Sequence, residues 1–69
     1  MPLSNLKVGQ TGTISKIDGK DSIQKHLRNL GFVEGEQVAV INELMGNVIV
    51  NIKGSRVALN QSIADRIIL

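Results

Sequence analysis

Few side chains in this sequence are of the types that carry out covalent chemistry. A hydrolytic nucleophile needs a Ser, Thr or Cys held beside a base, and the only histidine of the chain is His26. His26 lies in the middle of an expected helix, and no serine near it is framed by glycines. The sequence therefore predicts that the chain has no catalytic triad.

Phosphate-binding and acid–base sites are also poorly represented. Gly9-Gln10-Thr11-Gly12 supplies two glycines, but the lysine and the spacing of a phosphate-binding loop are missing. Glu34 and Glu36 are expected in one exposed loop, with no pocket around them in which they could act as an acid–base pair. We therefore expect a protein that is not an enzyme and that holds no cofactor.

A metal site would have to use His26. Its nearest acid in sequence, Asp21, is not three or four residues away, so the two side chains do not share a helix face. We expect His26 to be a half-exposed helical histidine, and we assign no metal ligand. A weak site that uses His26 and nearby acids stays open as an alternative.

Length and composition favour one small domain over residues 1–69. The chain has 69 residues, no cysteine and a net charge of +2, so its stability depends on an apolar core and not on disulfides. It contains no apolar run long enough to span a bilayer and no signal-peptide pattern, which makes the cytoplasm the expected location. Its basic residues are scattered among acids, which argues against nucleic-acid binding, as does the single aromatic residue.

The pattern of residues predicts a mainly β protein. The β-branched segment Thr11–Ile17 indicates a strand, although Ile14 and Ile17 cannot face the same side unless a bulge or strong twist intervenes. Asp21, followed three residues later by Gln24, resembles a capping box that opens a helix over Ser22–Leu30. The remaining strands are predicted at 37–43, 48–53, 56–59 and 66–69, the first two as a hairpin, with Asn60 capping a short turn before the last.

About five short strands and one inserted α-helix favour a small SH3-like antiparallel barrel, because closure hides strand edges. The predicted core is almost wholly aliphatic: Leu6, Val8, Ile14, Ile23, Leu27, Leu30, Phe32, Val38, Val40, Val48, Val50, Ile52, Val57, Leu59, Ile63 and Ile67.

Some apolar residues of the predicted strands are expected to point away from the core. If Val40 and Val50 point inward, strand alternation sends Ile41 and Ile49 outward. Leu44 and Met45 at the hairpin tip extend the patch, and Arg56 lies near the next turn. An exposed apolar patch on a small domain is typical of a docking site, so these five residues are the predicted partner-binding site. The alternative is that the helix or a terminus covers them.

One segment joins a helix end, a loop and a strand start. Gly31 stands where a left-handed residue would end the helix, and Phe32 can fold back on Leu27. With Leu6, Gly9, Gly12 and Ile14 before it and Gly54–Leu59 after it, the segment Leu27–Val38 gives the whole chain a close resemblance to the FeoA family. Asn29 and the hairpin tip 44–48 depart from the usual family pattern, which has an acidic residue at the first position and prolines at the tip.

The resemblance implies an SH3-like accessory protein of ferrous iron uptake. It implies docking on the cytoplasmic GTPase region of FeoB, the membrane transporter, by a protein that is monomeric or weakly self-associating. It does not imply insertion into the membrane. The alternative from another class is a small iron-binding sensor or carrier that uses His26 and nearby acids.

Overall fold

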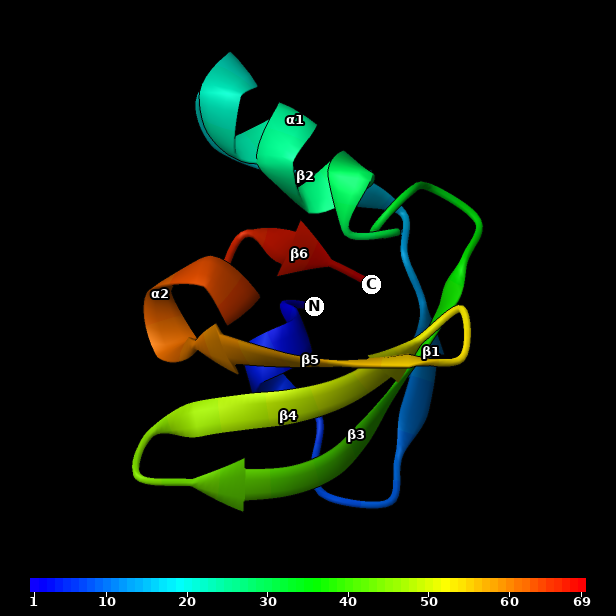
Figure 1. The fold of residues 1–69 in the computed structure, drawn as a ribbon, viewed down its shortest axis with the longest axis vertical. Helices are drawn as coiled ribbons and strands as arrows, with labels where there is room; N and C mark the ends of the chain where they lie inside the picture. The colour runs from blue at the N-terminus through cyan, green and yellow to red at the C-terminus, as the bar shows by residue number, and fades with distance from the viewer.

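The strands form two antiparallel sheets that lie against each other. The computed structural model describes residues 1–69 and contains a four-stranded sheet in the order β1-β3-β4-β5 and a two-stranded sheet of β2 and β6 (Figure 1). In chain order the elements are the 3-10 turn η1 (Leu3–Asn5), β1 (Thr11–Thr13), β2 (Lys16–Ile17), α1 (Asp21–Asn29), β3 (Gln37–Leu44), β4 (Asn47–Ile52), β5 (Ser55–Asn60), α2 (Gln61–Ala64) and β6 (Ile67–Ile68).

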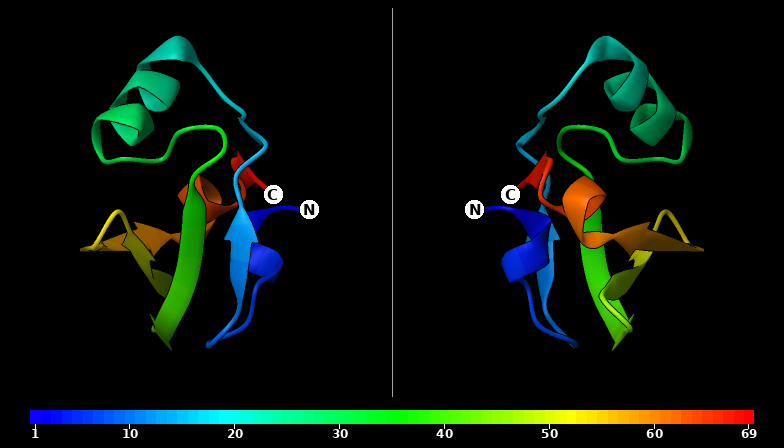
Figure 2. Two further views of the ribbon diagram at one scale, coloured as in Figure 1. Left: turned by 90° about the vertical axis from the view of Figure 1, so that its right-hand side faces the viewer. Right: turned by 90° about the vertical axis from the view of Figure 1, so that its left-hand side faces the viewer.

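This arrangement confirms the predicted mainly β, antiparallel class and corrects its details. The structure has six strands and two α-helices, where about five strands and one helix were predicted. The sheets curl around a common core, but no ladder joins β5 to β2 or β6, so hydrogen bonds do not close the barrel. Figure 2 shows α1 at one end of the molecule, standing off from the sheets, with the two termini close together.

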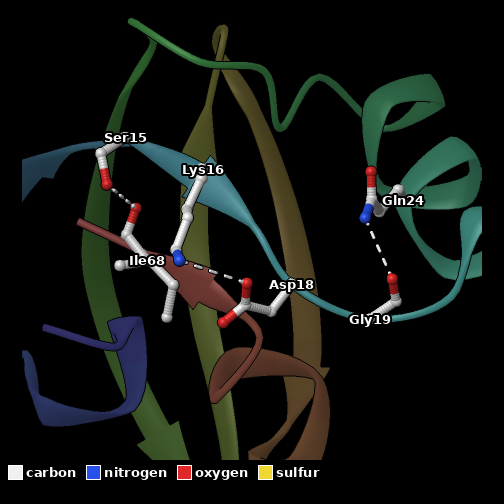
Figure 3. Close-up of polar contacts among 6 residues, drawn as sticks. All are labelled: Ser15, Lys16, Asp18, Gly19, Gln24 and Ile68. Carbon is white, nitrogen blue, oxygen red and sulfur yellow. Dashed lines mark hydrogen bonds and ion pairs between the residues drawn. The ribbon is translucent and has the colours of Figure 1, made fainter.

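The predicted strand Thr11–Ile17 is wrong as a single element, because the chain changes sheets inside it. Ile14 and Ile17 are both buried, and a regular strand cannot turn residues three positions apart toward the same side. The chain meets this requirement by ending β1 at Thr13, where it pairs with β3, and starting β2 at Lys16, where it pairs with β6. Ser15 marks the change: its N–H donates to the carbonyl of Ile68 at 2.7 Å, and its hydroxyl donates to the same oxygen at 3.1 Å (Figure 3).

The start of α1 differs from the predicted capping box. The helix runs over Asp21–Asn29, with Lys20 at the N-cap, and no side chain caps it. The Gln24 side-chain amide instead donates to the carbonyl of Gly19 at 3.0 Å, which ties the first turn to the preceding loop (Figure 3). Asp21 still lies in the first turn, where its negative charge is favourable to the helix dipole.

The end of α1 confirms the predicted glycine cap. Gly31 has a φ of +108°, in the left-handed region that favours glycine. The N–H of Phe32 donates to the carbonyl of Leu27 at 3.0 Å, and the N–H of Gly31 donates to that of Arg28 at 3.0 Å. This pair of bonds is the Schellman arrangement, and both Phe32 and Leu27 are fully buried beneath it.

The core is one apolar cluster between the two sheets, aliphatic except for Phe32. The buried residues are Leu3, Ile14, Ile17, Leu27, Phe32, Val38, Val40, Val48, Val50, Ile52, Leu59, Ala64 and Ile67. Leu6, Ile23, Val57 and Ile63 from the predicted core are only partly buried and pack against this cluster. Leu3, Ile17 and Ala64 were not predicted.

Two predicted core residues are exposed. Val8 is 53% exposed, because it lies in the turn that precedes β1 and not in a strand. Leu30 is 36% exposed, because α1 ends at Asn29 and Leu30 is already the C-cap, so the buried helical stripe stops at Leu27. Helical periodicity alone could not show where the stripe ends.

The strands of the main sheet are joined by two tight turns with the same backbone. Met45 and Gly46 connect β3 to β4 with φ values of +52° and +80°. Lys53 and Gly54 connect β4 to β5 with φ values of +50° and +77°. Two successive positive φ values are those of a type I′ turn, which suits the twist of paired strands. The predicted strands at 37–43, 48–53 and 56–59 left residues 44–47 and 54–55 as connections, and the structure replaces these with the two-residue turns.

The short helix α2 confirms the predicted cap. The side-chain oxygen of Asn60 accepts a hydrogen bond from the N–H of Ile63 at 2.9 Å. This bond turns the chain out of β5 and brings Ala64 into the core.

Candidate partner-binding surface

The β3–β4 hairpin places most of the predicted site residues on one face. Val38, Val40, Val48 and Val50 alternate toward the core, so the residues between them point the other way. Ile49 lies on this outer face, half-buried, and pairs with Ala58 of β5.

A bulge in β3 changes the neighbour expected for Ile49. Val40 pairs with Val50, but the next pair is Asn42 with Ile49, so Ile41 is an extra residue in the ladder. Two residues of β3 then face one residue of β4, which increases the local twist. Ile41 is 36% exposed and lies beside the Asn42–Ile49 pair.

The tip of the hairpin carries the most exposed apolar side chains of the chain. Leu44 closes the turn opposite Asn47 and is 59% exposed, and Met45 is 94% exposed. Neither residue belongs to the core cluster or packs against it. The outer face therefore runs from the half-buried Ile49 to the almost free Met45. We call Ile41, Leu44, Met45 and Ile49 the hairpin surface.

Val8 is an additional apolar residue that the sequence analysis placed in the core. The N–H of Gly9 donates to the carbonyl of Val40 at 2.8 Å, so the turn that holds Val8 lies against β3 next to Ile41. Gly9 directly follows Val8 and is typical of a turn, and that signal could have identified Val8 as a turn residue.

Arg56 lies apart from the hairpin tip. It pairs with Asn51, and alternation puts it on the same outer face as Ala58 and Ile49. The tip end of β5 is Asn60, so Arg56 is four residues away, about 14 Å along the strand. The two ion pairs of the molecule, Lys16–Asp18 at 3.7 Å and Lys53–Glu36 at 3.8 Å, do not include Arg56. The structure thus places Arg56 beside Ile49 on the outer face, two residues along β5 from the residue that pairs with Ile49, and away from Leu44 and Met45 at the tip.

The structure also bears on metal binding, small-molecule binding and membrane crossing. His26 is exposed on α1. No three His, Cys, Asp or Glu side chains lie close enough together to hold a metal ion, and the surface has no pocket. No helix combines the length and apolar character that crossing a bilayer requires.

Comparisons with known proteins agree with the resemblance predicted from the sequence. A family model described as the FeoA domain matches residues 1–69. A protein described as an Fe(2+) transport protein A, from Methanocaldococcus jannaschii, is 31% identical over 68 residues, which cover 99% of this chain and 83% of that protein.

Solved structures give the same result. The crystal structure of Stenotrophomonas maltophilia FeoA complexed with zinc, described as a procaryotic SH3 domain protein, has a TM-score of 0.87 and 30% identity; the match covers 99% of this chain and 87% of that one. The solution structure of Chlorobium tepidum FeoA has a TM-score of 0.89 and 25% identity, over 97% of this chain and 66% of that one. The predicted SH3-like architecture is thereby confirmed.

Proposed function

Because this chain belongs to the FeoA family, we propose that it is a non-enzymatic, cytoplasmic accessory protein of ferrous iron transport. It docks on the cytoplasmic GTPase region of a FeoB-like transporter through the hairpin surface and modulates transport. The family gives the link to Fe(2+) transport, and the transporter as partner follows from that link.

The observation that carries the proposal is the exposure of the hairpin tip. Leu44 ends β3 and Met45 begins the two-residue turn; they are 59% and 94% exposed, whereas the valines of the same hairpin are buried. Holding a Met at φ +52° also works against the turn, since Asn, Asp and Gly are the residues that favour this conformation. An apolar contact with a partner accounts for both features.

Methionine suits such a contact. Its unbranched, polarizable side chain adapts to the shape of an apolar pocket. Aliphatic neighbours at Leu44 and Ile41 widen the contact, and Arg56 supplies a positive charge at the far end of the same face. The hairpin surface would form the centre of the interface and Arg56 its polar rim.

A titration of the isotope-labelled chain with the full-length FeoB-like transporter in nanodiscs tests the proposal. The amide and methyl signals of Ile41, Leu44, Met45 and Ile49 are expected to lose intensity first. A parallel titration with ferrous iron provides the comparison. The proposal fails if the transporter leaves the hairpin signals unchanged, and saturable shifts around His26 with iron alone would favour an iron-binding protein instead.

A further inference from the structure

Met45 is the most accessible sulfur of the chain. The sequence contains two methionines and no cysteine, so Met1 and Met45 are its only sulfur atoms. Met45 is 94% exposed and Met1 is 56% exposed. Met1 is also held at the C-terminal end of the chain, where its amine donates to the carbonyl of Leu69 at 3.1 Å and its carbonyl accepts from the N–H of Leu69 at 2.7 Å.

The surroundings of Met45 leave the thioether unprotected. The residue sits at the apex of a two-residue turn, and a Cβ at the adjacent Gly46 would have no heavy atom within 4 Å. Its side chain makes no contact with the core cluster. Oxidants in solution can therefore reach the sulfur from most directions.

We propose that Met45 is a site of reversible oxidation by peroxides, and that its sulfoxide releases the partner from the hairpin surface. The second part of this inference rests on the proposed function. In the step itself, the thioether sulfur attacks one oxygen of hydrogen peroxide and the O–O bond breaks. The sulfur gains that oxygen and loses two electrons, and the peroxide is reduced to water.

The reverse reaction needs thiols as the reductant. A thiol-dependent methionine sulfoxide reductase supplies two electrons and two protons, and the sulfoxide oxygen leaves as water. The oxidised side chain is polar and carries a strong hydrogen-bond acceptor, which opposes burial in an apolar interface.

Because Met45 lies outside the core, its oxidation should affect partner binding without affecting the stability of the fold. Sulfoxide formation in a core disrupts packing, but Met45 is 94% exposed and lies outside the core cluster. The oxidised protein should therefore keep its fold and lose only its apolar tip. A protein that acts in ferrous iron transport would meet peroxide under conditions where free ferrous iron is harmful, and weaker docking would then couple transport to oxidant level.

Selective oxidation is the first test. Limited treatment with hydrogen peroxide, followed by peptide mass analysis, should convert Met45 to the sulfoxide faster than Met1. The unfolding midpoint of the oxidised protein should match that of the untreated protein. Equal rates at the two methionines, or a lower unfolding midpoint, would overturn the assignment of Met45 as a selective surface site.

Binding to the full-length FeoB-like transporter in nanodiscs is the second test. Oxidised protein should bind roughly tenfold more weakly, the size of effect expected at a central contact residue. The matched control is Met45→Leu, in which peroxide can oxidise only Met1: whatever the starting affinity of this variant, peroxide treatment should leave that affinity unchanged. Met45→Gln should imitate the oxidised protein without peroxide.

The outcomes separate this inference from the proposed function. If untreated protein binds and oxidised protein binds equally well, the oxidation switch is wrong and the docking proposal stands. If untreated protein does not bind the transporter at all, the docking proposal and the release of the partner are both wrong, and the selective oxidation of Met45 is decided by the first test alone.

Discussion

Two turns of the main sheet have the same backbone and different side chains. Met45–Gly46 and Lys53–Gly54 both place a non-glycine residue near φ +50° and a glycine near +80°. Lys53 has contacts that account for it: it pairs with Glu36 at 3.8 Å, and its Cδ lies 3.5 Å from where a Cβ of Gly31 would stand. Met45 has none and is 94% exposed. The fold therefore accounts for Lys53 at one turn, and we propose that a partner accounts for Met45 at the other.

The largest expected effect is on partner binding by a matched pair of variants. Met45→Asn should weaken binding to the transporter by about 2 kcal/mol, roughly 30-fold, because it removes a central apolar contact. Lys53→Asn makes the same change at the other turn and should leave affinity within about twofold. Isothermal titration calorimetry measures both affinities. Equal losses of affinity in the two variants would show that Met45 contributes no more to binding than Lys53.

The glycines of the two turns should respond equally. Gly46→Ala and Gly54→Ala each place a Cβ in the left-handed region, which costs about 1–2 kcal/mol of folding free energy. Neither new methyl group meets a heavy atom within 4 Å, so no packing term distinguishes them. Urea denaturation gives the two values. A difference greater than the strain itself would mean that the turns do not share a backbone.

The same Met45→Asn variant should gain folding stability while it loses binding. Asn-Gly is a preferred type I′ pair, so the free energy of unfolding should rise by about 0.5 kcal/mol. Lys53→Asn should gain less, because the replaced lysine gives up its ion pair and its packing over Gly31. Thermal unfolding of the two variants tests this order. A destabilised Met45→Asn variant would reveal a structural role for Met45.

The smallest effect concerns the ion pair at the second turn. The Lys53 and Glu36 side chains are 50% and 38% exposed, so water and salt screen their attraction. Glu36→Gln should change the free energy of unfolding by less than about 0.5 kcal/mol, and added sodium chloride should reduce that difference further. If the loss exceeds about 1 kcal/mol and persists in high salt, the contact is more than a surface pair.

Short-range patterns were good guides to the ends and turns of elements. Gly31 predicted the Schellman cap and Asn60 predicted the cap of α2, because each depends on hydrogen bonds within about five residues. The hairpin of β3 and β4 followed from two β-branched runs separated by a glycine. The prediction of a capping box at Asp21 was wrong, because the Gln24 side-chain amide donates to the carbonyl of Gly19 instead.

Features that depend on pairing between distant segments were less predictable. The bulge at Ile41 arises from the register between β3 and β4, and the residues next to Ile41 in the sequence do not predict it. The exposure of Val8 depends on how its turn meets β3 through the Gly9–Val40 hydrogen bond. The placement of Arg56 away from the hairpin tip likewise follows from the β4–β5 register.

The sequence by itself determined the class of the fold, the glycine cap of α1, the Asn60 cap of α2, the hairpin and the family, because periodicity and turn residues act over a few neighbouring positions. The tertiary structure decided where the chain changes sheets between Ile14 and Ile17, and which apolar side chains remain outside the core. The physical reason is that an apolar residue is buried only when a segment far away in the chain arrives to cover it. No such segment covers Leu44 and Met45.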